Sequence, residues 1–178
     1  MSKHSRRLVV PLAATLLLLP VRHAGAQTPE PEANMVAAVI ASLAEPNRRI
    51  YLAPGLELPA SAVNAGLRGR ARHNANTLEH VQKRFNATIA YPEEVMECPD
   101  ASRPETCTIP GDGVVFFFVA PSTPIRNDIL PVRVILYHNG RGEGGQILRE
   151  AWDLLVRRSD EGWTVVQKRL FATANGPA

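Results

Sequence analysis

The sequence has few of the residues from which metal sites and common catalytic sites are built. It holds two cysteines and five histidines in 178 residues, and only three of the histidines, His73, His80 and His138, lie beyond position 26. No His-x-x-x-His spacing places two ligands on one helical turn, and no serine lies in a Gly-x-Ser-x-Gly segment. We therefore expect no metal and no cofactor, and no motif in the chain identifies a reaction.

Long apolar runs are scarce as well, and the longest lies at the amino terminus. Lys3, Arg6 and Arg7 precede the apolar stretch Leu8–Pro20, and the small residues Ala24–Ala26 follow it. This order is typical of a secretory signal, and the apolar stretch is too short to span a bilayer. We predict cleavage after Ala26 and export to the periplasm or the medium, with no transmembrane segment in the mature chain. Because Arg6 and Arg7 also fit a twin-arginine signal, both export routes remain open.

The mature chain has no excess of positive charge. The full sequence carries 20 Lys and Arg residues against 17 Asp and Glu, but four of the basic residues and none of the acidic ones lie in the first 26 positions. Residues 27–178 therefore hold 16 basic and 17 acidic residues, a net charge of −1. This balance argues against nucleic acid as a partner, and the length suits a single domain over 27–178.

The two cysteines, Cys98 and Cys107, lie nine positions apart in a proline-containing segment. An exported chain with an even number of cysteines commonly pairs them. A redox pair would need the Cys-x-x-Cys spacing, and two distant thiols are too few for a zinc site. We therefore predict a structural disulfide between Cys98 and Cys107.

The first half of the mature chain predicts helices and short strands. Apolar residues at helical spacing predict one helix from Ala33 that ends before Pro46. They also predict a second helix that runs to Phe85 and begins at a polar cap, Asn76 or Thr77. Three shorter elements are expected: strands at 49–52 and 88–91, and a helix at 60–66.

The second half predicts an antiparallel sheet. Its first strand, Val114–Ala120, is apolar throughout, so alternation places Phe116 and Phe118 on one face and Phe117 with its valine neighbours on the other. Both faces need a cover, which helices, the curled sheet, a ligand or a second copy of the chain can supply. The whole pattern predicts an α+β fold, with N-terminal helices packed on a curved antiparallel sheet. The other strands are expected at Leu130–His138, Gln146–Arg157 and Trp163–Ala172.

A two-residue turn at Asp160 and Glu161 predicts how the last two strands pair. Asp153 then becomes half of a cross-strand ion pair, which gives this acid a structural role. The predicted pairs are Val156 with Val165, Leu155 with Val166, Trp152 with Arg169, and Asp153 with Lys168.

The segment Gln146–Phe171, a strand followed by an acidic turn with Gly162 and then Trp163-Thr164-Val165-Val166, resembles the nuclear transport factor 2-like, or cystatin-like, group of α+β proteins. The resemblance implies an apolar pocket between a curved sheet and its helices. It also implies that some members use a pocket Asp, Tyr or His as a general acid or base in isomerase or dehydratase chemistry, while others bind ligands or dimerise. No catalytic position of that group maps onto this chain residue by residue.

These observations lead to two expectations about function. The first is a non-enzymatic exported domain that binds an apolar small molecule or a protein partner, which can be a second copy of the chain. The alternative is a cofactor-free isomerase, dehydratase or hydrolase in which Asp153, Glu150 or His138 acts as acid or base. The residues expected to line the ligand site or interface are Phe116, Phe118, Tyr137 and Trp152.

Overall fold

A computed structural model describes residues 31–57, 71–100, 103, 106–120, 129–140 and 146–175. The predicted signal peptide, Met1–Ala26, and the predicted helix at 60–66 lie outside these residues. The described elements are α1 (Pro31–Leu43), β1 (Ile50–Leu52), β2 (Gly55–Leu56), β3 (Ala71–Arg72), α3 (Ala75–Phe85), β4 (Thr88–Ile89), α4 (Pro92–Val95), a 3-10 turn η2 (Pro110–Asp112), β5 (Val114–Val119), β6 (Ile129–Asn139), β7 (Ile147–Ser159) and β8 (Gly162–Asn175).

The first two predicted helices are present as α1 and α3. In α1 the apolar side chains of Val36, Val39 and Ile40 are fully buried, as expected for an amphipathic helix. The predicted cap of α3 was wrong by two or three residues. Its N-cap is Asn74, whose backbone is extended and whose side-chain oxygen accepts a hydrogen bond from the backbone N–H of Thr77.

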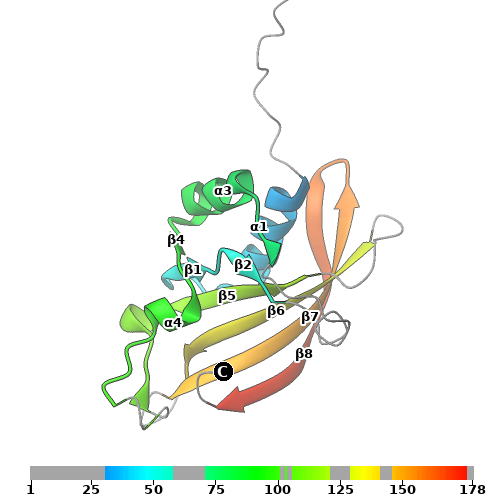
Figure 1. Ribbon diagram of the computed structural model, residues 1–178. Coiled ribbons are helices and arrows are strands. Elements are labelled where there is room, and N and C mark those ends of the chain that lie inside the picture. The colour runs from blue at the N-terminus through cyan, green and yellow to red at the C-terminus, as the bar shows by residue number, and fades with distance from the viewer. Residues whose placement is uncertain are drawn as a thin grey trace, which may run out of the picture.

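The main sheet has six strands in the order β4-β1-β5-β6-β7-β8, and a separate β2–β3 hairpin forms a second sheet (Figure 1). The strands β5 to β8 form the expected antiparallel meander, but β1 runs parallel to both β4 and β5. The sheet is therefore mixed, and the α+β class is confirmed. Parallel neighbours need a long connection, which the segment with α3 supplies between β1 and β4 and the segments with α3 and α4 together supply between β1 and β5.

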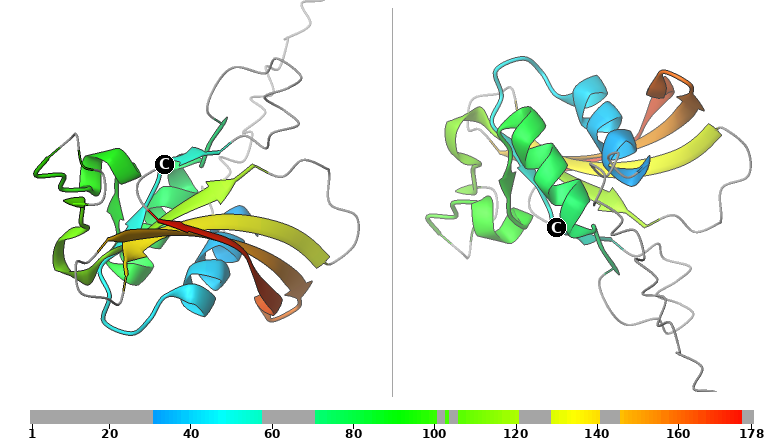
Figure 2. Two further views of the ribbon diagram at one scale, coloured as in Figure 1. Left: turned by 90° about the horizontal axis from the view of Figure 1, so that it is seen from below. Right: turned by 90° about the horizontal axis from the view of Figure 1, so that it is seen from above.

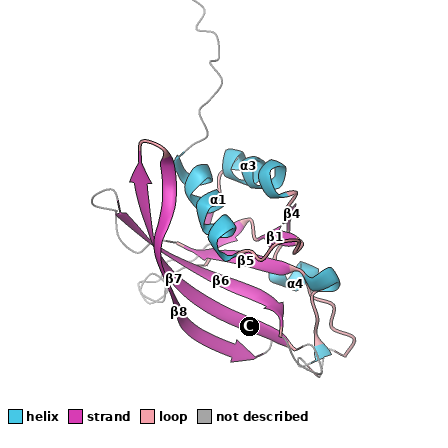
Figure 3. Ribbon diagram, turned by 180° about the vertical axis from the view of Figure 1, so that it is seen from behind, coloured by secondary structure: helices cyan, strands magenta, loops and turns pink. Residues whose placement is uncertain are grey.

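Strand β5 is buried on both faces, as its sequence predicts. Phe116 and Phe118 belong to the core under the helices, whereas Val115 and Phe117 belong to a second core on the opposite face. Figure 3 shows α1 and α3 together on one side of the sheet, with α4 near one end of β5. The second core is covered by α4 and the segment that follows it, through Val95, Cys107 and Ile109. The chain itself therefore supplies both covers over the centre of β5.

The last hairpin follows the predicted register only near its turn. Val156 faces Val165, but one β-bulge after Val165 shifts Leu155 to face Gln167 instead of Val166. Beyond this bulge, β8 is displaced by one residue relative to the prediction, and a second bulge at Phe171, between the partners of Trp152 and Ala151, displaces it by one more. The predicted partners of Trp152 and Asp153 were therefore also wrong: Trp152 faces Leu170, and Asp153 faces Arg169.

The turn end of β7 and β8 curls toward α1, so the sheet wraps around that helix (Figures 1 and 2). The ammonium of Lys168 donates a hydrogen bond to the backbone carbonyl of Ser42 at 2.8 Å, which ties β8 to α1. Most of β8 is nevertheless exposed, and it is an edge strand of the sheet.

Cys98 and Cys107 form the predicted disulfide, with an S–S distance of 2.00 Å. The disulfide links the two ends of the segment between Cys98 and Cys107. Cys107 is buried in the second core, so the disulfide also attaches this segment to that core. Among the described helices, none has the length and apolar character needed to cross a membrane.

Candidate functional site

An apolar cavity of about 380 Å³ lies at one end of the helix-covered face of the sheet. Its walls come from the start of α1, the β2–β3 hairpin, the adjoining ends of β5 and β6, and the start of β8. The apolar lining includes Met35, Val36, Leu56, Phe118, Val132 and Trp163. Small-molecule sites commonly have volumes of about 300–1,000 Å³ and mainly apolar walls, so both the size and the lining suit a small apolar ligand.

A carboxylate–imidazole pair interrupts this apolar wall. Nδ1 of His73 lies 2.8 Å from Oε1 of Glu32, and the side-chain amide of Asn74 donates to Oε2 of Glu32, also at 2.8 Å. Glu32 belongs to the first turn of α1, whereas His73 and Asn74 immediately precede α3. The pair therefore connects two segments separated by 41 positions in the sequence.

Backbone and ring contacts hold His73 in the cavity wall. Its N–H donates to the carbonyl of Pro54 at 3.1 Å, and its ring stands edge-on to that of Phe118 with 5.5 Å between centroids. The side chain of His73 is only 2% exposed, against 35% for Glu32. Nε2 of His73 is buried and has no hydrogen-bond partner among the residues that the structure describes. A buried polar atom without a partner needs an explanation, because it has lost its hydration.

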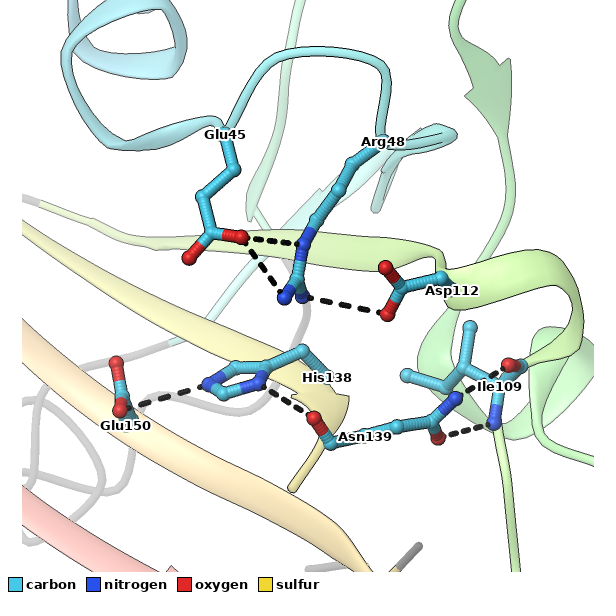
Figure 4. Close-up of polar contacts among 7 residues, drawn as sticks. All are labelled: Glu45, Arg48, Ile109, Asp112, His138, Asn139 and Glu150. Carbon is cyan, nitrogen blue, oxygen red and sulfur yellow. Dashed lines mark hydrogen bonds and ion pairs between the residues drawn. The ribbon is translucent and has the colours of Figure 1, made fainter. Parts of the chain in front are cut away.

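A second cleft, of about 390 Å³, lies at the other end of the same sheet face, between the end of α1 and strands β5 to β7. Here Nε2 of His138 lies 3.5 Å from Oε1 of Glu150, and Nδ1 lies 3.1 Å from the carbonyl oxygen of Asn139 (Figure 4). The indole N–H of Trp152 donates to Oε2 of Glu150 at 2.9 Å. The structure thus brings together two of the three predicted acid–base candidates, Glu150 and His138.

The opposite wall of this cleft includes the half-buried guanidinium of Arg48. Arg48 pairs with Glu45 at 3.0 Å and lies 3.8 Å from Asp112, as Figure 4 shows. The amide of Asn139 supports the neighbouring loop by bonding both the N–H and the carbonyl of Ile109 at 2.8 Å. The charged side chains of the second cleft therefore already have hydrogen-bond or ion-pair partners within the protein. Nε2 of His73, a residue that lines the first cavity, has none among the described residues.

The four predicted lining aromatics lie in four different surroundings. Phe118 lines the apolar cavity and Trp152 lines the second cleft. Phe116 is fully buried in the core and lines neither of them. Tyr137 lies on the opposite face of the sheet, where its hydroxyl accepts a hydrogen bond from Arg149 and burial raises its pKa. Alternation along β6 explains the separation of Tyr137, since its neighbours Leu136 and His138 point to the helix face.

Asp153 is an ion-paired surface acid. Its carboxylate accepts hydrogen bonds from Arg133 at 2.7 and 3.1 Å and from Arg169 at 3.2 Å. The hydrogen bonds from Arg133, and secondarily the one from Arg169, lower the pKa of Asp153. The structural role predicted for Asp153 is present, but the partner is not Lys168, because the bulge places Arg169 opposite Asp153. A carboxylate held ionised by two guanidinium groups is a poor proton donor and, with its pKa lowered, a weak base, which argues against an acid–base role for Asp153.

Glu32 and His73 were not identified from the sequence as parts of a site. Glu32 reads as an ordinary acidic residue in the first turn of a helix, and His73 has no ligand or catalytic spacing to another histidine. A local signal was available in Asn74, whose residue type suits an N-cap and would have placed His73 directly before a helix start. The contact across 41 positions requires the tertiary fold.

Comparisons with protein-family models, with curated proteins and with solved structures found no match. The resemblance of the last hairpin to the nuclear transport factor 2-like group therefore stays a prediction.

Proposed function

We propose that this protein is an exported domain that binds an apolar small molecule in the cavity between α1, the β2–β3 hairpin and the sheet. The observation that carries the proposal is the cavity itself, with about 380 Å³ of space and a mainly apolar lining. The curl of the sheet around α1 supports the related proposal of a nuclear transport factor 2-like fold (Figure 2).

The driving force for binding is the removal of apolar surface from water. Each square ångström of apolar ligand surface buried contributes about 25 cal/mol before the costs of association are subtracted. Rigid walls reduce those costs, and Val36 and Phe118 in the wall also belong to the main core. The cavity is therefore preformed over the part of its surface that these two residues supply.

Export is proposed on separate grounds. The basic, apolar and small-residue order of positions 1–26 is that of a secretory signal, and the disulfide suits an oxidising compartment. The intact mass of the protein from its native compartment tests this proposal. We expect a chain that begins at Gln27 with Cys98 and Cys107 oxidised, and a mass that still includes Met1–Ala26 contradicts cleavage.

Titration with the uncharged fluorescent probe N-phenyl-1-naphthylamine tests ligand binding. Two matched variants, Met35→Trp and Met96→Trp, each enlarge a half-buried methionine. Met35 lines the cavity, whereas Met96 packs against the core on the opposite face of the sheet. We expect the wild type and Met96→Trp to bind the probe with similar affinity, and Met35→Trp to bind at least tenfold more weakly because its indole occupies the cavity.

Either of two results overturns the binding proposal. One is that the wild type gives no saturable fluorescence change. The other is that Met35→Trp, shown to be folded by its unfolding transition, binds the probe as the wild type does. The second result places the probe elsewhere on the protein.

A protein partner is the second candidate, and the exposed edge strand β8 favours it. Exposed edge strands offer unpaired backbone groups to another chain. The ring of Phe171 is 56% exposed, and the guanidinium of Arg133 lies 4.3 Å from its centre. Sedimentation velocity at increasing concentration tests self-association, with Phe171→Glu as the variant. A dimer that Phe171→Glu dissociates supports a second copy on this surface, and a concentration-independent monomer contradicts it.

A further inference from the structure

His73 lines the cavity and carries one unused hydrogen-bonding atom, Nε2, which lies behind the wall. This atom is buried and has no partner in the described part of the chain. The other ring nitrogen, Nδ1, and both carboxylate oxygens of Glu32 do have partners, because Glu32 forms hydrogen bonds with His73 and with Asn74. The question is whether Nε2 is an acceptor or a donor, since this decides which ligand group it can take.

The hydrogen-bond network answers this by elimination. The side-chain oxygen of Asn74 accepts from the N–H of Thr77, so its NH₂ group must be the one that faces Glu32. Oε2 of Glu32 therefore acts as an acceptor. An ionised carboxylate has no hydrogen to donate, so Oε1 also acts as an acceptor. Nδ1 of His73 must then carry the hydrogen that points to Oε1 of Glu32.

With its hydrogen on Nδ1, a neutral imidazole has a bare lone pair on Nε2. A protonated ring would instead carry a buried N–H with no acceptor among the described residues, which is the costlier arrangement. Glu32 thus fixes the ring in the tautomer that presents an acceptor, in the way that a carboxylate orients other functional histidines. Nε2 requires a hydrogen-bond donor.

We propose that the ligand of the cavity is an apolar molecule with a hydroxyl group, an alcohol or a phenol, which donates its hydrogen bond to Nε2 of His73. This inference rests on the proposed function and names its ligand class. The apolar walls bind the body of the ligand, and His73 recognises its hydroxyl. A purely hydrocarbon ligand leaves Nε2 unsatisfied, and a carboxylate has no hydrogen to donate.

Contact with Nε2 requires a small movement of the wall, because this atom is buried. Met35 is suited to make room. It lines the same cavity, it is half-buried, and an unbranched thioether side chain changes its conformation at low cost.

The test is competition between a bound fluorescent probe and two matched competitors, 2-naphthol and naphthalene, which differ by one hydroxyl. N-phenyl-1-naphthylamine serves as the displaced probe. A hydrogen bond that contributes a net free energy of about 1 kcal/mol predicts that 2-naphthol competes with an affinity about fivefold higher than that of naphthalene. His73→Phe should abolish this preference while naphthalene still competes. His80→Phe is the control, because Nε2 of His80 is also buried and unpartnered but His80 does not line the cavity.

The outcomes separate the inference from the function on which it rests. Equal displacement by the two competitors, or a preference that persists in His73→Phe, overturns the hydroxyl assignment and leaves apolar binding intact. If neither competitor displaces the probe, or the probe does not bind, the proposed function fails and the inference fails with it. A preference that His73→Phe removes and His80→Phe retains supports the inference.

A measurement on the wild type covers the case in which His73→Phe does not fold. Two-bond ¹H–¹⁵N correlation spectra report which ring nitrogen carries the hydrogen. We expect His73 to show hydrogen on Nδ1, and its Nε2 resonance to shift with 2-naphthol but not with naphthalene. Hydrogen on Nε2, or an identical response to both compounds, overturns the assignment.

Discussion

The Glu32–His73 couple predicts a large energetic coupling between two residues far apart in sequence. In Glu32→Ala, the N–H at Nδ1 of His73 stays buried but loses its acceptor, because the His73 side chain is only 2% exposed. Stranding a buried donor costs about 1–3 kcal/mol. Loss of a negative charge from the first turn of α1 adds about 0.3–1 kcal/mol. We therefore expect Glu32→Ala to lower the free energy of unfolding by about 1–4 kcal/mol.

His73→Phe should cost less than Glu32→Ala. The phenyl ring keeps the edge-on packing with Phe118, and it removes both the donor and the unpartnered Nε2. The Glu32 carboxylate that remains is 35% exposed, so water can solvate it. The double variant then has no stranded donor, and its loss of stability should be smaller than the sum of the single losses by about 1–2 kcal/mol.

Urea unfolding of the four proteins measures this coupling, and equal urea dependence of the unfolding free energy shows that the variants unfold from comparable states. The dipole contribution of Glu32 cancels in the cycle, because it is lost in the presence and in the absence of His73. Strictly additive losses would refute the reasoning. They would show that Glu32 and His73 make no specific hydrogen bond in solution.

Three further predictions concern the disulfide, the surface ion pairs and the core. Replacing Cys98 and Cys107 by serine should lower the free energy of unfolding by about 2–3 kcal/mol in urea, since the closed loop is short. Asp153→Asn should lower stability at pH 7 by at most about 1 kcal/mol, because the pairs are exposed. The folded-state pKa of Asp153 lies below its unfolded value of about 3.9, so urea unfolding should show this difference above pH 4 and lose it as the pH falls through the folded pKa. Phe116→Ala should cost about 3–5 kcal/mol, yet bind N-phenyl-1-naphthylamine within twofold of the wild type.

Each of these predictions has a contradicting result. An unchanged unfolding midpoint after loss of both cysteines would remove the stabilising role of the disulfide. A difference between Asp153→Asn and the wild type that does not decrease as the pH falls below 4 would show that Arg133 and Arg169 do not depend on an ionised acid. Probe binding that disappears in a folded Phe116→Ala protein would place the ligand in the core and not in the cavity.

The sequence was most informative where the pattern is local. Apolar periodicity identified α1 and the strands β5 to β8, and the turn at Asp160 and Glu161 fixed the first pairs of the last hairpin correctly. The bulges in β8 were not predictable, because the residues concerned, Val166 and Phe171, suit a regular strand equally well. Each bulge moves the register by one, and the bulge at Val166 alone was enough to give Asp153 the wrong partner.

The site was harder to predict than the fold because it depends on contacts between distant segments. Alternation correctly placed Phe118 on the same face of the strand as Phe116, but neither periodicity nor spacing distinguishes the cavity residue Phe118 from Phe116. Phe118 differs from Phe116 in its position along the strand, because the cavity lies at the end of β5, where Phe118 is. Likewise, Glu32 and His73 meet only because α1 and the start of α3 pack at that same end.

The most direct test of ligand binding in the cavity is to locate a bound probe by nuclear Overhauser effects between N-phenyl-1-naphthylamine and protein methyl groups. We predict contacts with Met35, Leu56 and Val132, which line the cavity. Contacts confined to the exposed Val166 and Leu170 of β8, or no contacts at saturating probe, contradict the proposal that this cavity is the binding site.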